Sequence, residues 1–133
     1  MIQGISMAKS NNSSKKHSLS FPVVGIGASA GGLEAISNFV KELDEDTGMA
    51  FVFIQHLDPK TPSSLREILS HITKVPIVQI KDGLKLKPNH FYVICSNTIV
   101  QIFEGAFSVK PRSDVPEFEH FPIDYFFLFI KII

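Results

Sequence analysis

The feature that most constrains the fold is a pair of apolar, β-rich runs separated by one helix-like segment. The runs cover residues 22–27 and 50–55, and apolar residues recur at helical spacing over residues 32–43 between them. A strand, a helix and a second strand in this order form a crossover whose two strands are parallel neighbours in one sheet. The sequence therefore predicts an α/β fold in which both strands end at the same edge of a parallel sheet.

Both strands lead into residues that can carry chemistry at that edge. The first is followed by a glycine-dense turn, Gly27-x-Ser29-x-Gly31, which has the spacing of a nucleophile elbow. The second run is followed directly by His56. Neighbouring strand axes are about 4.8 Å apart, and an imidazole placed so can accept the proton of a serine hydroxyl. Ser29 is therefore the predicted nucleophile and His56 the predicted general base.

The glycine turn has two other interpretations. Gly25-x-Gly27-x-x-Ala30 fits a loose dinucleotide-binding fingerprint, which needs an acidic residue at the end of the second strand to hold the ribose. Here the second run is followed by His56, and Asp58 comes only after the strand should have stopped, so a dinucleotide-binding fragment is the weaker alternative. The turn can also be purely structural, and His56 is the residue that argues against this interpretation.

Several stretches resemble the catalytic domain of the chemotaxis protein-glutamate methylesterases (CheB type). They are residues 25–35, Gln55-His56, Asp82-Gly83 and Pro88-x-His90-x-Tyr92-Val93-Ile94. Residues 51–59 and 121–127 resemble more specifically the fusion proteins in which this domain precedes a receptor methyltransferase. The resemblance runs from about residue 22 to about residue 127, and its motifs are collinear.

The resemblance implies a doubly wound, mainly parallel, Rossmann-like sheet and a serine-hydrolase mechanism. Ser29 would attack the γ-methyl ester of a glutamate on a methyl-accepting chemoreceptor, with His56 as base, and water would then hydrolyse the acyl-enzyme. Related enzymes also deamidate receptor glutamines. The implied oxyanion donor is the backbone N–H of Ala30, a position where the best-known members carry a hydroxyl residue. No cofactor or metal is implied; the implied partners are chemoreceptors and a receptor methyltransferase domain, in the cytoplasm.

One motif of the family does not occur in these 133 residues. The family takes the third member of its triad from a Gly-Met-Gly-x-Asp-Gly loop, beyond the helix that here starts near Pro122. The aspartates that are present do not replace the aspartate of this loop. Asp58 is only two residues from His56, and Asp82 is in a predicted turn. Asp114 is in a predicted loop, and Asp124 is at a predicted helix start. We therefore expect residues 21–133 to be the N-terminal part of the domain, with impaired catalysis. The alternative function is a non-catalytic remnant that keeps a receptor- or partner-binding surface.

The composition of the chain and of its segments limits the classes of function and partner that remain. The chain has 13 acidic and 13 basic residues, which leaves no electrostatic footprint for nucleic acid. Residues 1–20 are polar and are predicted to be a disordered tail, without the apolar stretch of a signal peptide. The apolar run 121–130 is too short for a bilayer, which takes about 20 residues; it predicts a helix that strands later in the domain would cover. Cys95 is predicted to be a buried, unreactive thiol, and the histidines show no metal-binding spacing.

The rest of the chain alternates between further helices and strands. A helix is predicted over residues 62–71 and another from about residue 122. Strands are predicted over residues 76–80, 91–95, 98–103 and 106–110. The last three strands are expected to form hairpins, with turns at Asn97 and at Glu104-Gly105, and residues 110–120 a loop.

The missing aspartate loop generates a prediction about activity. Loss of a triad aspartate lowers turnover by about 10⁴, or about 5.5 kcal/mol of barrier. The 133-residue chain should therefore release methanol from methylated receptor at a rate little above background. A methanol assay that found turnover on the order of 10 s⁻¹, typical of enzymes, would contradict this expectation.

Overall fold

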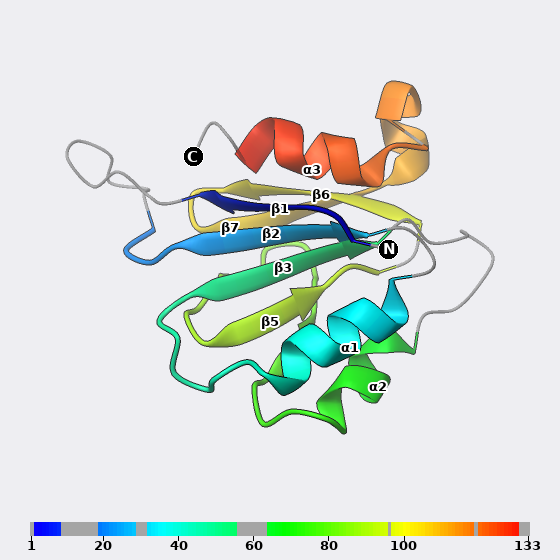
Figure 1. Cartoon of the computed structure of the whole chain (residues 1–133). Helices are drawn as coiled ribbons and strands as arrows, with labels where there is room; N and C mark the ends of the chain where they lie inside the picture. Colours follow the sequence, from blue (N-terminus) through cyan, green and yellow to red (C-terminus); the bar gives the residue numbers. More distant parts are fainter. Residues whose placement is uncertain are drawn as a thin grey trace.

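The computed structural model describes residues 2–8, 19–28, 32–55, 64–95, 97–118 and 120–130. Its helices are α1 (Leu33–Lys41), α2 (Leu65–Ser70) and α3 (Pro122–Ile130). Its strands are β1 (Ile2–Ala8), β2 (Val23–Ala28), β3 (Ala50–Gln55), β4 (Ile77–Gln79), β5 (His90–Val93), β6 (Thr98–Phe103) and β7 (Ala106–Pro111). Strands β1 to β5 form one sheet in the order β1-β2-β3-β5-β4, and β6 and β7 form a second sheet (Figure 1).

The predicted strand–helix–strand unit is confirmed. Strands β2 and β3 pair in parallel, with a continuous register that runs from Val23 opposite Ala50 to Ala28 opposite Gln55. Strand β5 pairs in parallel with β3 on one side and with β4 on the other. Four parallel strands and their crossover helices make the mainly parallel α/β fold that the sequence predicts.

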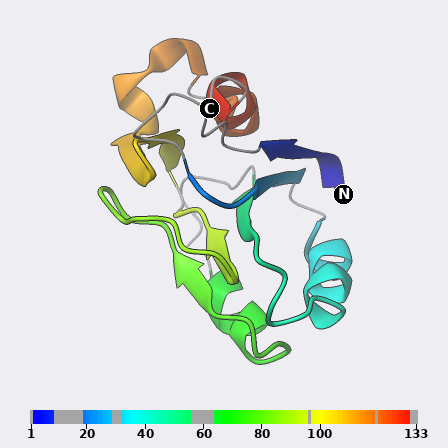
Figure 2. The same ribbon diagram turned by 90° about the vertical axis from the view of Figure 1, so that its left-hand side faces the viewer.

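Each face of the sheet has its own apolar core, because side chains alternate along a strand. Figure 2 shows α1 and α3 on opposite sides of the central strands. The core under α1 and α2 includes Val24, Ile26, Phe51 and Phe53 of the sheet, together with Ile36, Val40, Leu65 and Leu69 of the helices. The core on the other face includes Val23, Val52, Ile54, Tyr92, Val100, Phe107 and Phe126.

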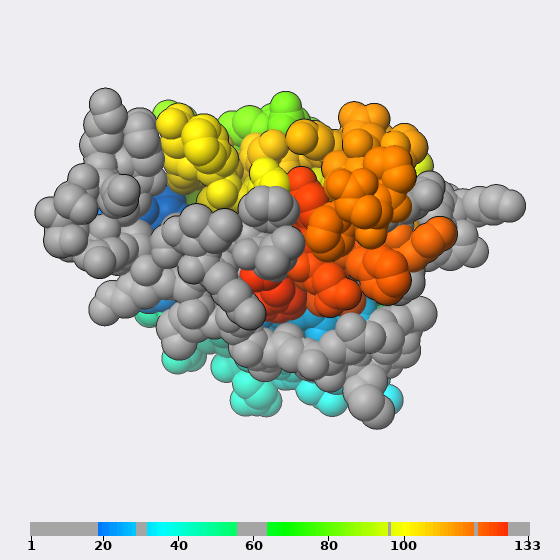
Figure 3. All heavy atoms as spheres, turned by 90° about the horizontal axis from the view of Figure 1, so that it is seen from above, coloured from blue at the N-terminus to red at the C-terminus, as the bar shows by residue number. Residues whose placement is uncertain are grey.

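Helix α3 lies directly on the backbone of β2. A Cβ atom at Gly27 would be 2.6 Å from Cγ2 of Ile123, and one at Gly25 would be 2.9 Å from Cε2 of Phe126. Phe126 is only 1% exposed. Two glycines on one face of an otherwise apolar strand thus allow the helix to approach closely. The predicted apolar helix is covered by the sheet itself, and Figure 3 shows α3 beside the 3₁₀ turns at Arg112–Asp114 and Pro116–Phe118 on this face.

The predicted hairpin around Glu104-Gly105 is confirmed. Glu104 and Gly105 have φ values of 53° and 77°, and two adjacent residues with positive φ suit the twist of a two-residue hairpin turn. The hairpin β6–β7 is fastened to the chain after β4: the N–H of Gly83 donates to the carbonyl of Phe107, and the N–H of Phe107 donates to that of Leu84, both at 2.8 Å.

The expectation that β5 joins this set of hairpins is wrong. Strand β5 lies inside the main sheet, where β3 and β4 occupy both of its edges, so it has no free edge for β6. Asn97 has a φ of 61° and leads the chain out of the main sheet into the second one. The predicted loop over residues 110–120 is also partly ordered, because β7 continues to Pro111 and the two 3₁₀ turns follow it.

The prediction of a disordered tail over residues 1–20 is wrong for its first part. Residues Ile2–Ala8 form β1, antiparallel to β2, with Ile5 opposite Ile26 and Met7 opposite Val24. Leu19 is also part of the core, while residues 9–18 lie outside the described residues. The physical reason is the outer edge of β2, whose backbone groups gain hydrogen-bonding partners when β1 pairs with them.

Asn89 links the loops that precede β3 and β5. Its φ is 66°, in the left-handed region that asparagine tolerates better than most residues. Its backbone N–H donates to the carbonyl of Met49 at 2.8 Å, and its side-chain Oδ1 accepts from the N–H of Gly48 at 2.7 Å. The next residues along the two strands, Ala50 and His90, are register partners.

The contact between α3 and β2 generates a prediction about stability. Gly27→Ala should lower the free energy of unfolding by about 1–3 kcal/mol, the usual range for overpacking, because the new Cβ meets Cγ2 of Ile123 at 2.6 Å. Urea unfolding followed by circular dichroism measures the change. In an Ile123→Ala background the same substitution should cost less, since the clashing methyl group is gone. Additive effects of the two substitutions would contradict the proposed contact.

Candidate functional site

The candidate site is the edge of the sheet at which β2 and β3 end. The last residues of the two strands, Ala28 and Gln55, are register partners in adjacent parallel strands. Ser29 and His56 are the next residues along the chain. Ser29, Ala30 and His56 lie outside the residues that the structure describes, so their roles as nucleophile, oxyanion donor and base stay predictions. The described strands bring the chain to one place directly before both of them.

Helix α1 begins at the same edge. Its first residue is Leu33, its N-cap is Gly32, and its first backbone hydrogen bond joins the N–H of Ile36 to the carbonyl of Gly32 at 2.9 Å. The first turn of a helix carries free backbone N–H groups and a partial positive charge. Figure 1 shows this end of α1 beside the ends of β2 and β3. The electrostatics of the edge therefore favour a group that develops negative charge.

Gly27 has a second role that the nucleophile-elbow interpretation missed. The motif assigned Gly27 to the sharp turn around Ser29, whereas the structure places it in β2 under Ile123 of α3. Gly25 has the same role one pleat earlier, under Phe126 and Phe127. A glycine inside an apolar strand is a known sign of close backbone approach, so the sequence did carry a signal for this packing.

Three of the four aspartates that the sequence analysis considered lie in the described part of the chain. Oδ1 of Asp82 accepts a hydrogen bond from the backbone N–H of Val109 at 2.9 Å and so holds the hairpin β6–β7. Asp114 is in a 3₁₀ turn, and Asp124 is exposed in the first turn of α3. Asp58 lies outside the described residues. None of Asp82, Asp114 and Asp124 is in β2 or β3, the strands that define the site.

Gln55 is a polar residue of the site that the sequence analysis did not single out by itself. It is 6% exposed and is the last residue of β3, directly before His56. It stands two positions after Phe53, on the face of the strand that α1 and α2 cover. A polar end to an apolar strand is the signal that marks it.

Cys95 follows β5 near the same edge and behaves as a structural thiol. Its Sγ–H points to the carbonyl of Ile80 at 3.7 Å, and the side chain is partly buried. Burial raises the pKa of the Cys95 thiol, which the positive charge of Lys81 and a hydrogen bond with Gln79 only partly offset. A thiol with a raised pKa carries little thiolate at neutral pH and is a poor nucleophile.

The described histidines and acidic residues form no group of three or more that suits a metal ion. His71 caps the C-terminus of α2. The ring of His90 stacks on Tyr92, and its Nδ1 is 2.8 Å from the carbonyl oxygen of Pro88.

Within the described part of the chain, no helix is long and apolar enough to cross a membrane.

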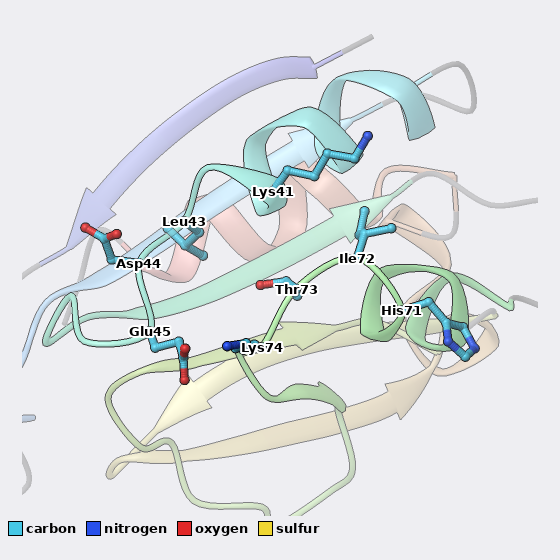
Figure 4. A pocket seen from close by; sticks show the side chains of 8 residues that line it. All are labelled: Lys41, Leu43, Asp44, Glu45, His71, Ile72, Thr73 and Lys74. Atoms are coloured by element: carbon cyan, nitrogen blue, oxygen red, sulfur yellow. The ribbon is translucent and has the colours of Figure 1, made fainter.

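A separate pocket of about 440 Å³ opens at the other end of the molecule. It lies between the segments that follow α1 and α2 and precede β3 and β4, where the parallel strands begin. Figure 4 shows Lys74 and Glu45 pointing toward each other across it, while His71 points away. The pocket is therefore remote from the edge that Ser29 and His56 follow, and the sequence analysis did not predict it. Its lining is formed by Lys41, Leu43, Asp44, Glu45, His71, Ile72, Thr73 and Lys74.

Comparison with known proteins places this architecture. The profile of the CheB methylesterase family matches residues 24–131. A protein-glutamate methylesterase/protein-glutamine glutaminase of Pseudomonas aeruginosa is 29% identical over 96 residues, which are 70% of this chain and 29% of that protein. The corresponding protein of Bacillus subtilis is 26% identical over 108 residues, which are 79% of this chain and 30% of that protein.

The same comparison extends to solved structures. The catalytic domain of the Thermotoga maritima CheB methylesterase superposes with a TM-score of 0.73 at 21% identity, over 86% of this chain and 62% of that one. The fold is thus a doubly wound α/β domain of the methylesterase kind. With the profile match over most of its length, the chain belongs to the CheB methylesterase family. It spans less than a third of the length of these two curated relatives.

The environment of Cys95 generates a prediction about thiol reactivity. At pH 8 the folded chain should react with a chromogenic disulfide severalfold more slowly than the same chain in concentrated urea, because burial raises the thiol pKa and limits access. The rate in the folded state should rise with pH as thiolate forms. A folded-state rate equal to or above that of the unfolded chain would contradict the structural role of this thiol.

Proposed function

We propose that this chain carries the nucleophile and the general base of a protein-glutamate methylesterase. The observation that supports the proposal best is the register of β2 and β3, in which Ala28 and Gln55 are partners directly before Ser29 and His56. Membership of the CheB methylesterase family adds the reaction class. The substrate is a glutamate γ-methyl ester on a methyl-accepting chemoreceptor.

The proposed reaction proceeds in two steps. His56 takes the proton of the Ser29 hydroxyl, the oxygen attacks the ester carbonyl, and the tetrahedral intermediate expels methoxide, which leaves as methanol after receiving that proton. Water then attacks the acyl-enzyme, with His56 again as base, and releases the glutamate carboxylate and the free serine. With a glutamine substrate the same steps release ammonia, in keeping with the glutaminase part of the relatives' names.

The oxyanion of each step needs preorganised donors. The backbone N–H of Ala30 is the proposed donor, and the first turn of α1, which begins at Leu33, adds its partial positive charge. A backbone N–H is offered by any residue other than proline, so alanine in place of a hydroxyl residue does not remove this donor. Gln55, the residue directly before His56, is buried at the end of β3.

A non-catalytic binding module is the second candidate function. The observation that favours it is that none of the aspartates that the structure describes lies in β2 or β3, the strands that precede Ser29 and His56. In this case the chain would bind a chemoreceptor or a receptor methyltransferase domain without turnover. Both candidate functions have the same partners and the cytoplasm as the proposed location, with no nucleic acid and no insertion into a membrane.

A labelling experiment separates an activated serine from an ordinary one. A fluorophosphonate probe should form a covalent adduct at Ser29, detectable by intact mass and peptide mapping, because it reacts with serines that a base activates. His56→Gln should slow the labelling by about 10²–10⁴, the usual contribution of a general base. Ser29→Ala should abolish it.

Two exposed residues give matched controls. His71→Gln at the end of α2 and Ser20→Ala ahead of β2 should leave the labelling rate unchanged. Labelling that persisted at the wild-type rate in His56→Gln would contradict the proposed dyad. A chain that bound methylated receptor in a pull-down, yet showed no labelling at Ser29, would instead favour the binding module.

A further inference from the structure

Gln55 is a buried polar side chain whose carboxamide makes no hydrogen bond within the described part of the chain. It is 6% exposed at the end of β3, and no described residue donates to its carboxamide or accepts from it. By contrast, Nε2 of Gln101 donates to the hydroxyl of Tyr125 at 2.7 Å, and Gln79 hydrogen-bonds Cys95. Because the large majority of buried polar side-chain groups have a partner, Gln55 is an exception that requires an explanation.

Packing alone does not explain a carboxamide at this position. Phe53 precedes Gln55 by two residues in β3, and Ile26 and Ala28 of β2 share the same face of the sheet, the core under α1 and α2. An apolar residue at position 55 would extend this core. A carboxamide instead loses hydration on burial and gains no hydrogen bond in return. A partner from outside the chain would supply the missing bond.

A group outside the chain can reach the carboxamide. Its atoms are not among the unpartnered side-chain atoms of the described residues that are fully closed off from solvent. Gln55 is also the last residue of its strand, and so lies at the edge of the sheet rather than in its interior. The side chain is therefore held by burial and still open to a ligand at this edge.

The position of Gln55 coincides with the start of α1. Its register partner is Ala28, the last residue of β2, and α1 begins at Leu33, so that only residues 29–32 join this strand to the helix. Helix α1 covers the face of the sheet on which Gln55 lies, and its first turn brings free backbone N–H groups to the same edge. Gln55 thus adds a side-chain amide to an edge that already favours negative charge.

We propose that Gln55 is a side-chain donor to the oxyanion of the esterase reaction. Its Nε2–H donates to the carbonyl oxygen of the glutamate γ-methyl ester while that oxygen gains negative charge, and no proton is transferred. The assignment rests on the proposed roles of Ser29 and His56, and it gives the oxyanion a second donor beside the N–H of Ala30. Asparagine and glutamine side chains are among the groups that form oxyanion holes.

The missing hydrogen bond of the free chain is what makes this donor effective. Burial fixes the carboxamide before the substrate binds, so the reaction requires little reorganisation of the donor. The bond that forms strengthens as the carbonyl oxygen becomes an oxyanion, because hydrogen bonds to a charged acceptor are the stronger ones. An interaction that is stronger in the transition state than in the ground state raises the rate of the chemical step.

Labelling of Ser29 by a fluorophosphonate, whose phosphoryl oxygen takes the position of the oxyanion, tests the proposal on the full chain. Gln55→Met removes the donor and keeps a side chain of similar length. The limiting labelling rate at saturating probe should fall by about 10²–10³, the usual effect of one oxyanion donor. The probe concentration at half-maximal rate should change little, because the lost interaction belongs to the transition state.

Stability distinguishes this role from a structural one, and Gln101→Met is the matched control. The urea midpoint of Gln55→Met should equal or exceed that of the wild-type chain, because the buried carboxamide has no bond to lose. Gln101→Met removes the hydrogen bond to Tyr125, so its midpoint should fall while its labelling rate stays unchanged. If Gln55→Met fails to fold, Gln55→Glu keeps the shape of the side chain, and its carboxylate should slow labelling at least as much.

The possible results separate this assignment from the proposed function. Labelling of Ser29 that depends on His56 but proceeds at the wild-type rate in the Gln55 variants would overturn the assignment and leave the proposed function standing. A urea midpoint of Gln55→Met that falls as far as that of Gln101→Met would also overturn it, because Gln55 would then have a structural hydrogen bond. A wild-type chain in which Ser29 is not labelled would overturn the proposed function and the assignment together.

Discussion

The parallel pairing of β2 with β3 is the constraint on which the rest of the molecule depends. It requires a crossover, which α1 provides, and it aligns the two strands so that Ala28 and Gln55 end together. It also fixes which residues of each strand face α1 and which face α3. The candidate site, the two cores and the position of α3 all follow from this one ladder, because each is defined by a face or an end of these two strands.

Alternate residues of β2 pack in different ways on the two faces of the sheet. Val24, Ile26 and Ala28 fill the core beneath α1 and α2, whereas Gly25 and Gly27 leave the other face bare for α3. One face of β2 therefore presents apolar side chains to α1 and α2, and the other face has no side chains at Gly25 and Gly27, so that α3 can contact the backbone. A glycine motif before a serine thus reflects helix packing as well as turn geometry, and both demands act on the same short segment.

The local sequence pattern was sufficient to predict most of the helices and strands of the fold. Apolar runs bounded by turn residues located β3 and β6 at their observed limits, and helical spacing located α1 and α3. The failures concern pairing partners. The sequence of residues 91–95 does not indicate that both edges of β5 are paired in the sheet. Residues 1–20 are polar on average, so the short strand at Ile2–Ala8 was not predicted. The pairing of a strand depends on which strand edges remain free elsewhere in the sheet. The sequence of one segment does not contain this information. For the site, the sequence located the strand ends and carried signals for Gln55 and for the packing of Gly27, but only the structure shows that Gln55 is buried and that Ile123 of α3 lies over Gly27.

The link made by Asn89 decides which aromatic ring fills which core. Strands β3 and β5 are far apart in the sequence, and their ladder is short, so it could in principle form one residue out of place. A slip of one residue turns every side chain of a strand to the opposite face. Phe91 would then leave the core under α1, and Tyr92 would lose the face on which its hydroxyl accepts the N–H of Lys87. By joining Gly48 and Met49 to the start of β5, one amide side chain and one backbone N–H set the alignment before the first paired residues, Ala50 and His90, meet.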